Sequence, residues 1–205
     1  GLGDVYKRQM NYGTVTNCAN EESAQVTGGE LYAIGGVVGY NYSEITNCYN
    51  LGTLSVADGV EAAYVGGVAG LSYQKGYPTE TSAPSRIENC YSDTGSVVAG
   101  AQENSVFSSY YLADTETAET NGVTGKTAAQ FASGEVAHLL QGGQPDDGSG
   151  TIPQVWGQTL SGDAPDASPV LTADEGKAVY QVAFLVDGAE YAAAYANPNG
   201  TVTLP

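Results

Sequence analysis

The fold is decided by Ala33-Ile34-Gly35-Gly36-Val37-Val38-Gly39-Tyr40, a stretch that recurs as Tyr64-Val65-Gly66-Gly67-Val68-Ala69-Gly70-Leu71. In both copies two adjacent glycines precede two small apolar residues and a third glycine. Glycine at fixed places allows corners and close approach of the backbone. We therefore expect a structural role in a repeat for six glycines: Gly35, Gly36, Gly39, Gly66, Gly67 and Gly70.

A second phrase follows each glycine phrase. It reads Ile45-Thr46-Asn47-Cys48-Tyr49-Asn50 and then Ile87-Glu88-Asn89-Cys90-Tyr91-Ser92, and Val15-Thr16-Asn17-Cys18-Ala19-Asn20 is an earlier form. Phrases that recur in fixed order after about 30 residues mark a repeat architecture, in which each unit buries its apolar face against its neighbour. Short β-rich segments between Gly and Asn favour strands with tight turns. The sequence predicts a mainly β protein with parallel β-solenoid (β-helix-like) repeats.

The three cysteines share one position of the second phrase. Cys18, Cys48 and Cys90 show neither CxxC spacing nor Cys/His pairs, so no metal site is predicted. We expect a ladder of buried thiols on the inner side of successive repeats. One disulfide between stacked neighbours is the alternative. The residues three positions earlier should be buried beside the thiols; they are Val15, Ile45 and Ile87.

The composition is acidic and poor in charge. The 205 residues include 23 Asp and Glu but only 6 Lys and Arg, which gives a net charge of −17. Such a charge repels the phosphates of nucleic acids and anionic membranes, so neither is an expected partner. The sequence has no run of about 18 apolar residues and no recognisable secretory signal. It predicts no cofactor.

The chain divides into four segments. Residues 1–9 do not fit the repeat, resemble a translated sequencing adapter, and are interpreted as a non-native leader. Residues 10–109 hold the repeats, with a polar insertion at 74–85 that should protrude as a loop. Residues 110–178 are expected to form a capping or linker segment with a short helix, and residues 179–205 a truncated β-grasp-like module.

The capping segment carries a helix signal. Thr127 followed by Gln130 matches a capping box ahead of good helix formers. Gly134 interrupts this helix, which then resumes to about residue 141. We expect the helix and Trp156 to cover the last repeat, whose open edge would otherwise invite aggregation.

The last segment carries a hairpin signal. Tyr180, Val182, Phe184 and Val186 alternate along one strand face, and Asp187-Gly188 is a turn pair from which the chain can return. The later pair Asn199-Gly200 predicts another turn. Three short strands are marginal alone, so residues 179–205 should not fold in isolation.

Two family resemblances follow from these residues. Gly35-Gly36-Val37-Val38-Gly39-Tyr40-Asn41 and its second copy resemble the GLUG motif of bacterial surface proteins, although Val37 and Val68 stand where the motif prefers Leu. The strands and turns after residue 179 resemble the start of a Listeria–Bacteroides (internalin B-repeat-like) module of cell-wall proteins. The resemblance implies an extracellular location on a bacterial cell surface and names no activity.

Four candidates suggest chemistry, but each lacks an obligatory partner. Asp93-Thr94-Gly95 spells the aspartic-protease loop, whose mechanism needs a second such carboxylate, so a turn is expected. Gly125-Lys126-Thr127 ends like a phosphate-binding loop, but Thr120 stands where the first glycine is required; a loop leading to the N-cap is expected. His138 has no partner His or Cys and should be a partly exposed helix residue. Asp146-Asp147 lacks the other ligands of a calcium loop and should be solvated.

Tyrosines occur at matching places of the repeats. Tyr42 matches Tyr73, and Tyr49 matches Tyr91, so the pairs should stack between repeats; a stripe that binds sugars is the alternative. The candidate binding site combines the insertion with its flanking residues, because exposed loops that carry aromatic groups often bind partners. These residues are Tyr73, Lys75, Tyr77 and Arg86.

Two functions remain. The first is a non-catalytic surface module, such as a stalk, an adhesin or a region that binds host matrix protein or glycan, monomeric within a larger chain. The second is a β-helix carbohydrate-active enzyme such as a polysaccharide lyase. A lyase needs basic and acidic groups together in a cleft, and only Lys75 and Arg86 flank a place where they could serve. We therefore expect no catalytic residues and favour the module.

Overall fold

The computed structural model describes residues 10–22, 25–28, 33–56, 58, 64–74, 84–146 and 148–203. The protein is mainly β and divides into two compact units, Gly1–Gly125 and Lys126–Pro205, which we describe one at a time. The expected leader, most of the insertion, and with it Lys75 and Tyr77, lie outside the described residues.

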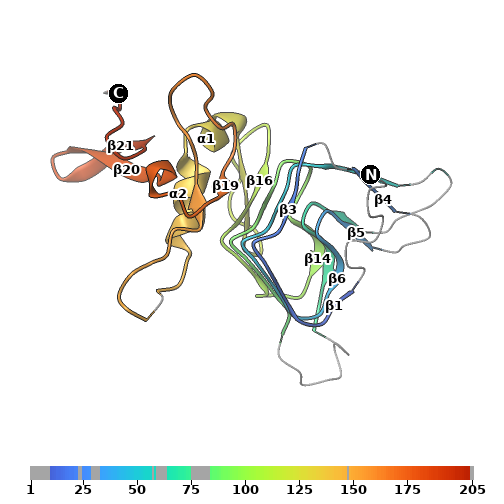
Figure 1. Ribbon diagram of the computed structural model, residues 1–205. Coiled ribbons are helices and arrows are strands. Elements are labelled where there is room, and N and C mark those ends of the chain that lie inside the picture. Colours follow the sequence, from blue (N-terminus) through green and yellow to red (C-terminus); the bar gives the residue numbers. More distant parts are fainter. Residues whose placement is uncertain are drawn as a thin grey trace. The chain divides into compact units, whose positions relative to one another are not determined.

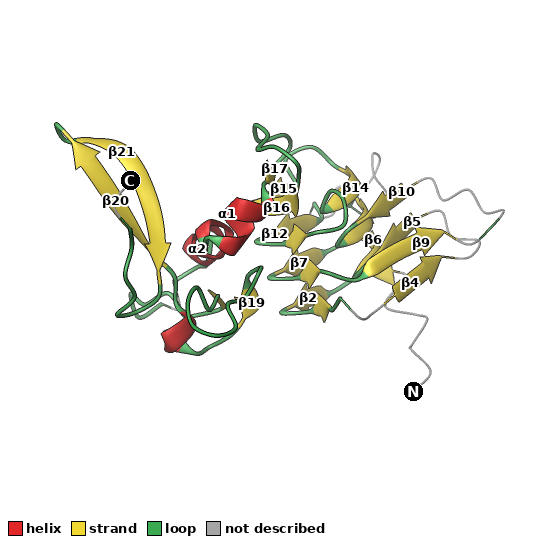
Figure 2. Ribbon diagram, turned by 90° about the horizontal axis from the view of Figure 1, so that it is seen from above, coloured by secondary structure: helices red, strands yellow, loops and turns green. Residues whose placement is uncertain are grey.

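Three sheets run through the first unit, and each takes a short strand from successive repeats (Figures 1 and 2). Sheet A comprises β1 (Met10–Asn11), β6 (Val38–Asn41), β11 (Ala69–Ser72) and β14 (Val98–Ala101). Sheet B comprises β2 (Thr14–Thr16), β7 (Glu44–Thr46), β12 (Arg86–Glu88) and β15 (Val106–Phe107). Sheet C comprises β3 (Ala19–Asn20), β8 (Tyr49–Asn50), β13 (Tyr91–Ser92), β16 (Ser109–Leu112) and β17 (Val123–Lys126).

Neighbouring strands are parallel throughout sheets A and B and from β3 to β16 in sheet C. The register places equivalent residues of the repeats side by side, as in the row Val15, Ile45, Ile87 and Val106. The chain passes from A to B to C and then returns to A. These parallel sheets are compatible with a β-helix.

A sharp corner joins sheets B and C in every repeat. Asn17, Asn47 and Asn89 occupy it with φ values of 53°, 52° and 52°, and Ser108 does so in the last repeat at 44°. Asn tolerates this left-handed conformation better than most residues because its short amide side chain bonds locally. The corner therefore explains why Asn precedes each cysteine.

The first two repeats carry extra strands between sheets C and A. They form the parallel pairs β4 (Gln25–Gly28) with β9 (Thr53–Val56) and β5 (Ala33–Gly35) with β10 (Tyr64–Gly66). Figure 2 shows these pairs together on one side of the first unit. The third repeat is shorter, because residues 93–97 lead directly from β13 to β14.

The core of the first unit lies between the three sheets. Its buried residues come mostly from the repeated phrases: Val15, Val37, Val38, Ile45, Cys48, Val68, Ala69, Ile87, Cys90, Val97, Val106 and Val123. Strands β16 and β17 continue sheet C beyond residue 109, where we had placed the end of the repeats. The sheet shows no break at that position, because Ser109 and Tyr110 take the places of Cys90 and Tyr91 in the next layer.

The second unit contains α1 (Ala128–Ala132), α2 (Glu135–Gly142), a 3₁₀ turn η1 (Glu175–Lys177), and the antiparallel pair β18 (Trp156–Gly157) with β19 (Val170–Leu171). The capping box is confirmed, since the Thr127 side chain accepts from Gln130 N and the Gln130 side chain accepts from Thr127 N. Gly134 separates the helices at φ 91°. Trp156 is fully buried in this unit. Its expected role as a cap stays a prediction.

The predicted hairpin is confirmed. Strands β20 (Tyr180–Val186) and β21 (Ala189–Ala196) pair antiparallel around Asp187 and Gly188, whose φ values are 52° and 81°. Two positive φ values are what a tight type I′ hairpin turn requires. Asn199 also has a positive φ of 60°, as expected for the next turn.

Candidate functional site

The glycine pairs bring the two repeated phrases together. A Cβ on Gly36 would overlap the side chain of Asn50, and a Cβ on Gly67 would overlap that of Ser92. The last residue of the second phrase thus fills the space that the glycine pair leaves open. This contact explains why both phrases recur in fixed order.

The third glycine serves a different contact. A Cβ on Gly70 would lie 2.7 Å from Ile34 N and 2.8 Å from Ala33 Cβ. Strand β5 therefore packs directly on the backbone of β11, and a side chain at position 70 would force the two apart. The glycine phrase fixes how the outer strand pairs lie on sheet A.

Buried amide ladders hold successive repeats in register. Asn11 Nδ2 donates to Asn41 Oδ1 at 2.9 Å, and Asn41 Nδ2 donates to Ser72 Oγ at 3.0 Å. In sheet C, Asn20 Nδ2 donates to Asn50 Oδ1 at 2.7 Å. A buried amide without a partner is costly, so these chains of bonds strongly favour one alignment of the strands.

The cysteine ladder is only partly as expected. Cys48 and Cys90 are buried, as are Val15, Ile45 and Ile87, and Cys90 Sγ lies 3.4 Å from Cys48 N. Cys18 is exposed, which corrects the expectation that all three thiols are buried. It lies between β2 and β3, and among the described residues these strands form the outermost layer of sheets B and C, with no strand of an earlier repeat beside them. None of the three cysteines forms a disulfide, so the alternative pairing is not seen.

The outer surface after sheet A carries a row of tyrosines. Tyr12 and Tyr42 stack with ring centroids 5.0 Å apart and planes at 11°. Tyr42 N donates to Asn11 O at 2.9 Å and Tyr73 N donates to Asn41 O at 3.0 Å, so the three residues occupy the same place in successive repeats. We call Tyr12, Tyr42 and Tyr73 the tyrosine row.

Further tyrosines adjoin this row. The ring of Tyr40 lies 6.0 Å from that of Tyr42, again at 11°. Burial raises the pKa of Tyr40, and the nearby Tyr42 and Tyr64 raise it further. The Tyr40 phenol thus remains a neutral hydrogen-bonding group at physiological pH. The second expected pair, Tyr49 and Tyr91, is confirmed as a stack at 5.1 Å and 2°, but both rings are buried and cannot form part of an exposed stripe.

Arg86 is the counterpart of Glu44 in the next repeat, and Glu44 follows Tyr42 of the tyrosine row by two residues. Its backbone N donates to Ser43 O at 2.7 Å, and it is in register with Glu44. Its Nε forms an ion pair with Glu88 Oε2 at 2.8 Å, and its guanidinium carbon lies 4.1 Å from the centroid of the Phe107 ring. Hydrogen bonding to Glu88 raises the pKa of Arg86, although burial opposes the shift.

The structure therefore brings two of the four predicted binding residues to one corner, between sheets A and B. Tyr73 is half-buried and follows β11, whereas Arg86 begins β12. Ser72 Oγ donates to Ser85 Oγ at 3.1 Å, and this hydrogen bond holds the two ends of the insertion together. Lys75 and Tyr77 lie outside the described residues. We call the tyrosine row together with Glu44 and Arg86 the corner face.

Sequence reasoning missed several members of this region. Tyr12 belongs to the first repeat, whose glycine phrase was not found, and Phe107 reaches Arg86 only through the register of β12 with β15. A third glycine phrase was also missed. Val97 O accepts from Val68 N at 2.8 Å, so residues 95–101 repeat residues 66–72, with Ser96 and Ala99 in place of two glycines.

The residues of the motifs that suggested chemistry lie in a turn, a strand and a helix. Asp93 lies in the turn expected there; burial raises its pKa, and its Oδ1 accepts no hydrogen bond from the described residues. Lys126 ends strand β17 rather than lying in a loop, because Gly125 N donates to Thr117 Oγ1 at 2.9 Å and the Lys126 ammonium binds Glu135 at 2.6 Å. His138 is a half-buried residue of α2, as expected.

The described part of the chain shows no cluster of three or more His, Cys, Asp or Glu side chains that could hold a metal. Asp146 accepts backbone hydrogen bonds from Gly148 and Gly150 through Oδ1. In the same described residues, no helix has the length and apolar character needed to cross a membrane.

Comparison with known proteins supports a GLUG-repeat protein. The family model described as the GLUG motif matches residues 30–55, which run from the first glycine phrase to β9. Searches of curated proteins and of solved structures found no match. The matched residues include the Gly36–Asn50 contact, the first cysteine of the buried ladder, and Tyr42 of the tyrosine row.

Proposed function

We propose that residues 10–126 form a parallel β-solenoid that serves as a non-catalytic binding module of an extracellular, wall-associated bacterial protein. The GLUG match and the parallel register of sheets A, B and C support the repeat architecture. The resemblance to bacterial surface proteins supports the location. The hairpin β20–β21 supports an internalin B-repeat-like module as the next segment of the chain.

The corner face carries the proposal. The tyrosine row offers stacked aromatic rings whose places are fixed by the repeat register. Tyr12 and Tyr42 cover one face of each other, and the exposed fraction of Tyr12 is 60%. Aromatic faces with a hydroxyl at the rim suit ligands that are apolar on one side and polar at the edge. A pyranose ring has this character, so we propose that the ligand is a glycan, free or attached to a host matrix protein.

The surroundings of Arg86 favour binding over turnover. Its guanidinium is already engaged by Glu88 and by the Phe107 ring, so it is positioned as a hydrogen-bond donor with a fixed direction. A lyase would also need a group to remove a proton from the substrate within hydrogen-bond reach. Among the described residues, Glu44 and Glu88 are the acidic groups beside Arg86, and Glu88 is held in the ion pair.

The test is a glycan and host-matrix binding screen run beside a turnover assay on acidic polysaccharides. For a ligand found in the screen, Tyr42→Ala should weaken affinity by roughly 1–2 kcal/mol or more, which is about tenfold. Tyr180→Ala is the matched control, because Tyr180 is an exposed tyrosine of the second unit. Turnover that Arg86→Ala abolishes would overturn the module and support a polysaccharide lyase instead.

A further inference from the structure

Sheet A ends in an unpaired edge. Strand β14 pairs with β11 on one side, and no strand among the described residues pairs with its other side. Ala69 N donates to Val97 O at 3.0 Å, so the alternation of a parallel ladder directs the N–H and C=O groups of Val98 and Gly100 away from β11. These backbone groups can accept another strand.

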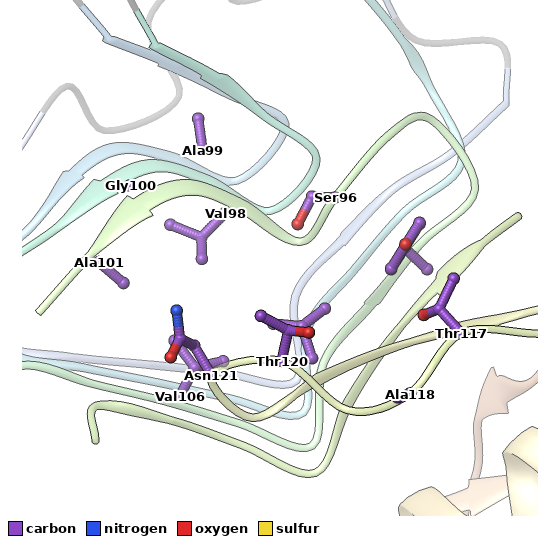
Figure 3. A pocket seen from close by; sticks show the side chains of 12 residues that line it. Ser96, Val98, Ala99, Gly100, Ala101, Val106, Thr117, Ala118, Thr120 and Asn121 are labelled. Atoms are coloured by element: carbon purple, nitrogen blue, oxygen red, sulfur yellow. The ribbon is translucent and has the colours of Figure 1, made fainter. Parts of the chain in front are cut away.

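A hollow of about 510 Å³ lies beside this edge. Figure 3 shows Val98 and Ala101 of β14 on one side of it, and Val106, Thr120 and Asn121 on the other. Thr117 and Ala118 line it farther along the segment that leads to Thr120. In earlier repeats the next strand of sheet A occupies the equivalent place. After β16 the chain instead runs through residues 113–122 to β17 of sheet C, so the hollow stands where a further strand of sheet A would lie.

The surroundings of the hollow are acidic. Glu103 follows β14, and Asp114, Glu116 and Glu119 are exposed on the segment opposite. The sequence has neither Lys nor Arg from Ile87 to Gly125. A second copy of this chain, with its net charge of −17, would be repelled, whereas a basic segment would be attracted.

We propose that the edge of β14 and the adjoining hollow bind a basic, extended peptide segment of a partner protein, which adds one strand to sheet A. Main-chain bonds to Val98 and Gly100 hold the segment, small apolar side chains enter the hollow over Val98 and Ala101, and Lys or Arg side chains meet the acidic surroundings. This surface is separate from the corner face and needs no glycan.

The test measures fluorescence anisotropy of the labelled peptide Lys-Val-Lys-Ala-Lys-Val-Lys with the full chain. Thr120→Phe, which fills the hollow from its far side, should weaken binding at least about tenfold. Thr115→Phe is the matched control in the same exposed segment, away from the lining residues, and should change affinity less than about twofold. Circular dichroism checks that both variants keep the β fold.

Two further peptides separate strand addition from simple charge attraction. A copy methylated on alternate backbone nitrogens keeps its charge but loses the N–H groups, and it should bind at least about tenfold more weakly. A Glu-Val-Glu-Ala-Glu-Val-Glu peptide should not bind. Equal binding of either peptide, no binding of the lysine peptide at millimolar concentration, or an unchanged affinity in Thr120→Phe would overturn the proposal. Self-association that Thr120→Phe abolishes would identify a second copy as the occupant and would also overturn it.

Discussion

Gly36 lies against the side-chain amide of Asn50, and the next repeat places Gly67 against Ser92 in the same way. The glycine phrase and the second phrase of each repeat therefore pack against each other within one layer of the fold. The contact needs glycine for lack of space and not for backbone conformation, because neither glycine has a positive φ.

Gly67→Ala should destabilise the protein by roughly 1–3 kcal/mol, because the new methyl group overpacks against Ser92. Gly13→Ala is the matched control: nothing lies within 4 Å of its Cβ position, so the free energy of unfolding should change by less than about 0.5 kcal/mol. Urea denaturation measures both. The double variant Gly67→Ala/Ser92→Gly should recover part of the loss, and equal losses in Gly13→Ala and Gly67→Ala would contradict the contact.

The thiols should differ in reactivity. Cys18 is exposed, whereas Cys48 is buried and its pKa is raised by its contact with Cys90 and by burial. In the native protein Cys18 should react with a maleimide at once, and the two buried thiols on the order of 100-fold more slowly. Mass spectrometry of quenched samples assigns each site. Rapid labelling of Cys90 would count against the buried ladder.

Cys48→Ser should be mild, at about 1 kcal/mol. The last place of this ladder is already a serine: Ser109 Oγ donates to Phe107 O at 2.9 Å, the same relation that Cys48 Sγ has to Thr46 O. A hydroxyl at position 48 can thus find an acceptor. Thermal unfolding compares this variant with Cys18→Ser, whose stability should equal that of the native chain. A loss of stability well above 3 kcal/mol in Cys48→Ser would show that a hydroxyl at position 48 finds no hydrogen-bond acceptor.

The second unit should lose stability in acid through Asp166. Burial alone would raise the pKa of Asp166, but the Thr159 N–H and the Lys177 ammonium outweigh it and lower the pKa below its ordinary value of 3.8. A lowered folded-state pKa adds stability above the unfolded-state pKa, and this stability is lost as pH falls through the folded-state pKa.

Asp166→Asn should therefore unfold more easily than the native chain at pH 7 and differ less from it at pH 3. Trp156, the only tryptophan, reports on this unit by fluorescence during heating. Asp163→Asn changes an exposed carboxylate nearby and serves as the control. A difference between Asp166→Asn and the native chain that stays constant from pH 7 to pH 3 would contradict the assignment.

Periodic residues revealed most of the first unit. Ile45 and Ile87 share a row because their phrases carry Ile, Asn, Cys and Tyr at the same places. The Thr127 capping box and the Asp187-Gly188 turn depend on neighbours in sequence. The features that sequence reasoning missed depend on how the chain packs in three dimensions. Ser96 stands where the previous copy has Gly67, so the third glycine phrase cannot be recognised by its paired glycines. Lys126 continues a strand because Gly125 N donates to Thr117 Oγ1, eight residues earlier in the sequence.

The candidate site was predictable only in part for the same reason. Tyr73 and Arg86 flank a visible insertion, which drew attention to them. Tyr12 lies in the first repeat, where no glycine phrase was found, and Phe107 lies in the last repeat, which begins with the altered glycine phrase at residues 95–101. Only the parallel register shows that these residues adjoin Tyr42 and Arg86.

The register of successive repeats underlies the tyrosine row, the thiol ladder and the open edge of β14, and one cross-link tests it directly. Thr16 and Thr46 are partners in β2 and β7, and their hydroxyl oxygens lie 3.1 Å apart. In a Cys18→Ala background, the pair Thr16→Cys/Thr46→Cys should form a disulfide on mild oxidation, because adjacent strands meet its geometric limits. The pair Thr16→Cys/Glu44→Cys, two residues out of register, should remain reduced. Cross-linking of the second pair instead of the first would contradict the account.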